Sequence, residues 1–122
     1  MIVAGFGFTS GASAASLTNA LAKTGHADQI TMLATPVDKA MAECILTLSK
    51  EHRLLIKAIY PSKLQAAQTQ THSAISRLLR RTGSVAEAAA LAAVGPGATL
   101  IVTRHISDDR MATCAIAQGP DT

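Results

Sequence analysis

The stretch that decides the fold opens the chain: Ile2-Val3-Ala4-Gly5-Phe6-Gly7-Phe8-Thr9-Ser10-Gly11-Ala12-Ser13. Its first seven residues are apolar or glycine, which is typical of a strand buried on both faces of a sheet. A glycine-containing turn follows, and Ser13 is a suitable N-cap for a helix over about residues 14–24. Gly25 is the expected stop of that helix. The stretch therefore predicts a strand, a tight turn and a helix in immediate succession.

The same alternation continues outward along the chain. In order, the pattern predicts a strand at 29–35, a helix at about 39–50 capped by Asp38, a strand at 53–60, a short helix capped by Ser62 and ending near Ala67, a helix at 85–94, and two strands at 99–103 and 111–117. The turn signal at 107–109 indicates that the last two strands pair as a hairpin.

Alternating strands and helices predict right-handed crossovers and a sheet that is covered on both faces. We therefore predict an α/β fold: a three-layer α/β/α single domain over residues 1–118, with a mixed sheet of about five strands closed by a C-terminal hairpin, and a flexible tail at 119–122.

Composition excludes several classes of function. The chain has 122 residues, 48% of them hydrophobic, with two phenylalanines, one tyrosine and no tryptophan. Such a chain lacks the aromatic platforms on which single-stranded nucleic acids stack, so we expect no nucleic-acid partner. No apolar stretch approaches the length that crosses a bilayer, and no signal peptide is evident. We expect a soluble, cytoplasmic protein without a membrane partner, in which Cys44 and Cys114 are buried, reduced thiols.

The net charge and the histidine spacing bear on ligands and metals. The net charge is +3, a modest bias that fits an acidic small molecule and equally an ordinary soluble protein. The four histidines show no zinc-ligand spacing, so we expect neither a metal nor a cofactor.

Ligands of open α/β sheets bind beyond the carboxyl ends of the strands. The first such end carries the glycine turn, and residues 1–27 contain no acidic side chain that could neutralise the positive end of the following helix. A carboxylate or phosphate of a ligand could occupy that position. The alternative is that the glycines only let strand and helix pack closely. A dinucleotide site is disfavoured because the spacing is Gly-x-Gly-x-x-x-Gly and no acid ends the second strand.

The second strand end carries Thr35, Asp38 and Lys39, with Glu43 one turn further. Lys39 is a candidate anchor for a substrate carboxylate. The alternative is that Asp38 is a helix cap, and that Lys39 and Glu43 form a solvated pair at positions i and i+4 of one helix.

A third candidate segment opens the helix at 85–94. Ser84 and Glu87 have the spacing of a capping box, which needs no ligand, and Glu87 is alternatively a catalytic base. Basic residues gather at Arg77, Arg80, Arg81, Arg104, His105 and Arg110, as a solvated rim or a surface for an anion.

Three segments in order resemble the family shared by CobE and the C-terminal domain of CbiG, across about residues 2–117. They are Val3-Ala4-Gly5-Phe6-Gly7 running to Ser13-Ala14, Thr35-Pro36-Val37-Asp38-Lys39 with Glu43, and Gly83-Ser84-Val85-Ala86-Glu87-Ala88-Ala89-Ala90-Leu91. The resemblance implies a role in building the corrin ring of cobalamin. CbiG-type proteins are similar to hydrolases that open the ring-A lactone of cobalt-precorrin-5A and release acetaldehyde, whereas CobE-type proteins are single-domain members of the aerobic route.

Because the chain starts at its first strand, we expect the CobE-like form. It would bind or hand over an acidic corrinoid or precorrin intermediate that resembles hydrogenobyrinic acid. One alternative is a cobalt-precorrin-5A lactone hydrolase with Asp38 or Glu87 as base. The other is an interaction module for a pathway methyltransferase or other pathway enzymes. The sequence is compatible with a homodimer. The expected substrate-binding residues are Gly5, Gly7, Thr9, Ser10, Gly11, Ser13, Thr35, Asp38, Lys39, Glu43, Ser84 and Glu87.

Overall fold

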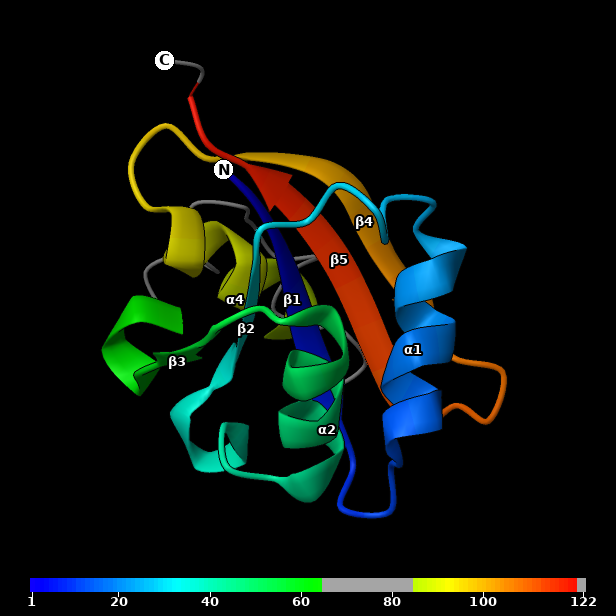
Figure 1. Cartoon of the computed structure of the whole chain (residues 1–122). Coiled ribbons are helices and arrows are strands. Elements are labelled where there is room, and N and C mark those ends of the chain that lie inside the picture. Colours follow the sequence, from blue (N-terminus) through cyan, green and yellow to red (C-terminus); the bar gives the residue numbers. More distant parts are fainter. Residues whose placement is uncertain (65–84, 121–122) are drawn as a thin grey trace.

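The fold is built on one open, five-stranded sheet in the order β3-β2-β1-β5-β4. The structure is a computed structural model that describes residues 1–64 and 85–120 (Figure 1). The strands are β1 (Ile2–Phe8), β2 (Met32–Pro36), β3 (Ile56–Ile59), β4 (Thr99–Ile106) and β5 (Ala112–Gln118). The first three are parallel, and β5 pairs antiparallel with both β1 and β4. The predicted mixed sheet and its C-terminal hairpin are confirmed, with β3 and β4 as the two edges.

Helices cover both faces of this sheet, which confirms the three-layer architecture. The helices α1 (Ala14–Lys23) and α2 (Glu43–His52) pack on one face, and α4 (Val85–Val94) packs on the other (Figure 1). The side chains of β1 alternate accordingly, because successive residues of a strand point to opposite faces. Phe6 joins the cluster under α1 and α2, whereas Val3 joins the cluster under α4.

The α4 layer lies close to the sheet because the residues between them have small side chains or none. The buried residues of α4 are five alanines and one leucine: Ala86, Ala88, Ala89, Ala90, Leu91 and Ala93. Gly5 lies directly beneath, and a Cβ at this position would stand 2.2 Å from the carbonyl oxygen of Ala86 and 2.5 Å from the amide nitrogen of Ala90. Gly5 therefore does allow a strand and a helix to pack closely, but the helix is α4 and not the one that follows β1.

Two predicted helix starts are wrong. The segment after β2 forms a short 3-10 helix, η1 (Val37–Lys39), and α2 begins only at Glu43, with Ala42 at the N-cap and no side-chain cap. Asp38 is thus not the cap of this helix. The chain makes two successive turns here, because the amide of Ala40 donates to Val37 and the amide of Ala42 donates to Lys39. These turns delay the start of the α-helix.

The helical residues after β3 begin at Pro61, so Ser62 lies inside this helix and does not cap it. A proline suits the first helical position because its missing N–H would have no partner there. The amides of Lys63 and Leu64 both donate to the carbonyl of Tyr60. The predicted end near Ala67 lies outside the described residues.

The second and third strands begin three residues later than predicted, at Met32 and Ile56. Arg53 adopts a left-handed conformation (φ 56°) and ends α2, so it cannot begin a strand. The helices α1 and α4 match the prediction closely, with Ser13 as N-cap of α1 and Gly25 at positive φ behind it. Within the described parts of the chain, no helix is long and apolar enough to cross a membrane.

Candidate functional site

The candidate site lies where β1, β2 and β3 end. The loop 9–13 follows β1, η1 follows β2, and Tyr60 follows β3; Pro36 and Ile59 are partners in the sheet, so their successors start side by side. The antiparallel hairpin brings a fourth segment to the same edge. The amide of Thr9 donates to the carbonyl of Met111, which precedes β5, at 2.9 Å.

The loop 9–13 is open to solvent. Thr9, Ser10, Gly11 and Ser13 are all exposed, and a Cβ placed on Gly11 would meet only the side chain of Met111, at 3.8 Å or more. The Thr9 hydroxyl contacts the Met111 sulfur at 3.2 Å. The predicted binding loop is therefore accessible, and the hairpin supports it from one side.

Ser13 and Ser16 form a reciprocal cap at the start of α1. The Ser13 amide donates to the Ser16 hydroxyl at 3.1 Å, and the Ser16 amide donates to the Ser13 hydroxyl at 3.3 Å. This capping box satisfies two of the amides that a helix N-terminus leaves without intrahelical partners. The Ser13 hydroxyl is thus already used in holding the helix.

The expectation that nothing acidic lies at the positive end of α1 is wrong. The Ser16 hydroxyl donates to a carboxylate oxygen of Asp109 at 2.5 Å, so an acidic side chain of the hairpin turn lies against the first turn of the helix. The other Asp109 oxygen accepts from the Ser107 hydroxyl and from the Met111 amide. These hydrogen bonds, that of Ser107 foremost and then that of Ser16, lower the pKa of Asp109. The carboxylate therefore stays charged and opposes a ligand anion at this helix end.

The same turn is tied to α1 by a second set of contacts. The Asp108 amide donates to the Asn19 side-chain oxygen at 2.7 Å, and the Asn19 amide group donates back to the Asp108 carboxylate at 3.3 Å. Lys23 forms a salt bridge with Asp108 at 2.6 Å, and its hydrogen bond and charge lower the pKa of Asp108. The turn at 107–111 is thus fixed against α1, next to the loop 9–13.

Lys39 stands over the end of β1. Its Nζ lies 5.5 Å from the centroid of the Phe8 ring, a cation–π geometry that keeps the ammonium group at the carboxyl edge. Asp38 and Glu43 are exposed. The predicted i, i+4 pair on one helix is wrong, since Lys39 ends η1 whereas Glu43 begins α2.

Three other predicted binding residues are buried or half-buried and contact the interior of the protein. Thr35 is fully buried, and its hydroxyl donates to the carbonyl of Phe6 at 3.0 Å. Gly5 is buried under α4, as described above. Gly7 is half-buried, and its carbonyl accepts a hydrogen bond from the Thr113 hydroxyl at 3.3 Å. These residues therefore support the strand ends through internal contacts.

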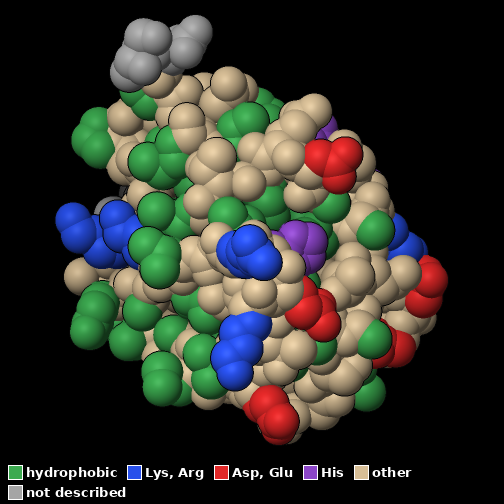
Figure 2. Space-filling view, viewed as in Figure 1, with side chains coloured by type: hydrophobic (Ala, Val, Ile, Leu, Met, Phe, Trp, Pro, Cys, Tyr) green, Lys and Arg blue, Asp and Glu red, His purple; other side chains and the backbone are tan. Residues whose placement is uncertain are grey.

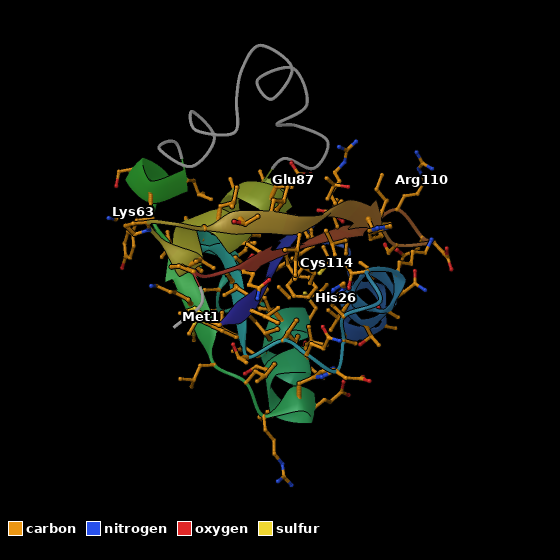
Figure 3. All side chains as sticks on the ribbon, turned by 90° about the horizontal axis from the view of Figure 1, so that it is seen from above. Met1, His26, Lys63, Glu87, Arg110 and Cys114 are labelled. Carbon is orange, nitrogen blue, oxygen red and sulfur yellow. The ribbon has the colours of Figure 1, made fainter. Side chains whose placement is uncertain are left out.

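Glu87 lies on the opposite face of the sheet from Lys39. Its carboxylate accepts a hydrogen bond from the backbone amide of Arg104 at 3.0 Å. A register irregularity between Val102 and His105 takes that amide out of the regular ladder with β5, and Glu87 satisfies it. Figure 3 shows Glu87 on the α4 side and Cys114 on the α1 side. Ser84, its predicted capping partner, lies outside the described residues.

The remaining predicted groups are the basic residues and the two cysteines. Arg77, Arg80 and Arg81 lie outside the described residues, whereas Arg104, His105 and Arg110 belong to β4 and the hairpin turn. Cys44 and Cys114 are free and buried, as predicted, and burial raises the pKa of both thiols. Within residues 1–64 and 85–120, no group of three or more histidine, cysteine, aspartate or glutamate side chains could hold a metal ion.

The residue that the sequence interpretation missed is Asp109. It is 93 positions from Ser16, and only the antiparallel pairing of β5 with β1 brings the two together. The turn signal at 107–109 identified the hairpin but not the helix that its acidic residues contact.

The fold and this edge define the class: an open-sheet α/β protein with an accessible, lysine-bearing site beyond its parallel strands. The chain belongs to the cobalamin synthesis G C-terminus family, whose family model matches residues 2–117. It is therefore a cobalamin biosynthesis protein of the CbiG C-terminal and CobE type.

Solved structures agree with this assignment. The chain is similar to the cobalamin biosynthesis protein chiG from Agrobacterium tumefaciens str. C58, with 30% identity, a TM-score of 0.76, and coverage of 99% of this chain and 100% of that one. It is also similar to CobE, a protein of the cobalamin (vitamin B12) biosynthetic pathway, with 29% identity, a TM-score of 0.75, and coverage of 96% and 89%.

A cobalamin biosynthesis protein G homolog from Sulfolobus solfataricus shares the fold, with 19% identity, a TM-score of 0.71, and coverage of 95% of this chain and 36% of that one. A search among curated proteins finds no match.

Proposed function

We propose that this protein binds an acidic corrinoid or precorrin intermediate of cobalamin biosynthesis at the carboxyl edge of β1, β2 and β3, and holds it for the next enzyme of the pathway. Family membership supports a role in cobalamin biosynthesis, and the accessible carboxyl edge supports this location for the binding site. The observation that carries the binding site is the Lys39 ammonium group, 5.5 Å from the Phe8 ring.

The charges at the edge give the ligand an orientation. Among the described residues, Lys39 has no carboxylate within salt-bridge distance, so its charge is available to a ligand. Asp109, in contrast, places a carboxylate at the first turn of α1. A ligand with several acetate and propionate arms would therefore direct a carboxylate toward Lys39, and its uncharged parts toward Thr9, Ser10 and Gly11.

A titration tests the proposal. Hydrogenobyrinic acid is added to the purified protein, and its visible spectrum and the heat of binding are followed. We expect binding in the micromolar range that weakens as salt is added, because a solvent-accessible ion pair is screened. Lys39→Ala should weaken binding about tenfold, the effect of losing one charge-assisted contact. Lys50→Ala, an exposed lysine in the last turn of α2, is the matched control and should bind like the wild type.

Two results would overturn the proposal. One is the absence of any binding in the micromolar range. The other is a Lys39→Ala variant whose affinity and salt dependence equal those of the wild type.

A lactone hydrolase is the second candidate, and the exposed Asp38, which precedes Lys39 in η1, favours it. A carboxylate next to a cation could activate water while the ammonium group polarises the lactone carbonyl. Glu87 is the weaker choice of base, because its carboxylate accepts the Arg104 amide. Acetaldehyde release from the precorrin-5A lactone, compared between wild type and Asp38→Asn, decides this. Release that Asp38→Asn leaves unchanged would exclude Asp38 as the base.

A further inference from the structure

Two large apolar side chains are exposed at the carboxyl edge. Met41 is 79% exposed and Tyr60 is 62% exposed. Met41 follows η1, and Tyr60 follows β3, which η1 contacts. Figure 2 shows hydrophobic side chains gathered at the lower left, over the end of β3 and the segment that leads into α2.

Tyr60 and the cation of the site belong to two different strand ends of the same edge. Lys39 stands over Phe8 at the end of β1, and Tyr60 follows the end of β3, two strands away. Neighbouring strands are about 4.8 Å apart, so the ends of β1 and β3 lie roughly 10 Å apart across the edge. This separation is comparable with the width of a tetrapyrrole-derived ring.

We propose that Tyr60 and Met41 form an apolar shelf that receives the ring of a polycarboxylate, tetrapyrrole-derived ligand, while Lys39 holds one of its carboxylate arms. The inference rests on the proposed function and adds to it the part of the site that recognises the ring. A ligand with a broad apolar centre and an anionic periphery matches an edge that offers both exposed apolar groups and a cation.

The chemistry of the two side chains suits this occupant. A tyrosine ring buries a large apolar area and offers its face to another flat group. A methionine side chain is flexible and polarizable, so it adapts to a puckered ring. A cation such as Lys63, which follows Tyr60 in the helical residues 61–64, gives a second place for an arm.

The chain carries its own reporter for this contact. Tyr60 is the only tyrosine, and the sequence has no tryptophan. Tyrosine emission of the wild type therefore comes from the proposed shelf alone. Binding of hydrogenobyrinic acid to the shelf should quench this emission in a saturable way, with the same dissociation constant as the change in the visible spectrum.

Variants separate the shelf from the cation. Tyr60→Ala should weaken hydrogenobyrinic acid binding about tenfold, whereas Tyr60→Phe, which keeps the ring, should bind within about twofold of the wild type. Tyr60→Ala should keep the salt dependence of binding, and Lys39→Ala should lose most of it. Leu55→Ala is the matched control, because Leu55 is 78% exposed at the opposite end of β3 and should have no effect.

The outcomes distinguish this inference from the proposed function. If the wild type binds and Lys39→Ala weakens binding, but Tyr60→Ala and Met41→Ala bind like the wild type, the shelf is excluded and the proposed function stands. If Leu55→Ala weakens binding as much as Tyr60→Ala, the shelf is likewise excluded. If the wild type does not bind at all, both fall together.

Discussion

Gly5→Ala is the most direct test of how this domain is packed. The added Cβ would stand 2.2 Å from the Ala86 carbonyl oxygen and 2.5 Å from the Ala90 amide nitrogen, where ordinary contacts begin at 3.4 Å. Both obstacles are backbone atoms of α4, so no side-chain rotation relieves them. The helix would have to move away from the sheet by roughly 1 Å, and its short alanine side chains would then lose contact with β1.

The magnitude follows from known overpacking costs. Inserting a methyl group into a packed core costs about 1–3 kcal/mol, occasionally more, and two backbone contacts place Gly5→Ala at the upper end. For a domain of this size each kcal/mol lowers the midpoint of thermal unfolding by roughly 3–5 °C, so we expect a decrease of about 10 °C. Circular dichroism during heating and urea unfolding measure both quantities.

Gly11→Ala, in the loop that follows β1, is the matched control. There a Cβ meets only Met111, at 3.8 Å or more, so we expect a change within about 0.5 kcal/mol. Gly5→Ala with wild-type stability, or Gly11→Ala destabilised to the same extent, would refute the argument that α4 rests on the backbone of β1.

Two further predictions concern the carboxylates that the fold uses. Because the hydrogen bonds from Ser107 and Ser16 lower the pKa of Asp109, its contribution to stability is present above the ordinary carboxyl pKa and is lost as the pH falls through the lowered value of the folded state. Wild type and Asp109→Ala should therefore differ in urea midpoint by a constant amount between pH 8 and about pH 5, and by less below about pH 4; a difference that grows toward low pH would contradict the assignment. Glu87→Ala should lose about 1–2 kcal/mol because the Arg104 amide loses its acceptor, whereas Glu87→Gln keeps an acceptor and most of the stability. If Glu87→Gln instead abolishes activity of a lactone hydrolase at full stability, Glu87 is the base and not a structural residue.

Much of the architecture was predictable because local patterns and global packing agree. The apolar run of β1, the Ser13 cap and the alanine-rich α4 each specify their element through nearest neighbours along the chain, and all three were confirmed. The start of α2 was not predictable in this way. Asp38 is a good cap by residue type, but the two turns after Pro36 postpone the helix to Glu43.

The amino-acid sequence alone settled the fold class, the family and the position of Lys39 at a strand end, since each depends on the order of residues along the chain. Only the tertiary structure decided which groups share the site. The antiparallel return of β5 carries Asp109 to Ser16 from 93 positions away, and α4 approaches Gly5 so closely that no Cβ fits there. Contacts between distant segments depend on which strands pair and on how closely the helices approach the sheet. The spacing of residues along the chain determines neither of these.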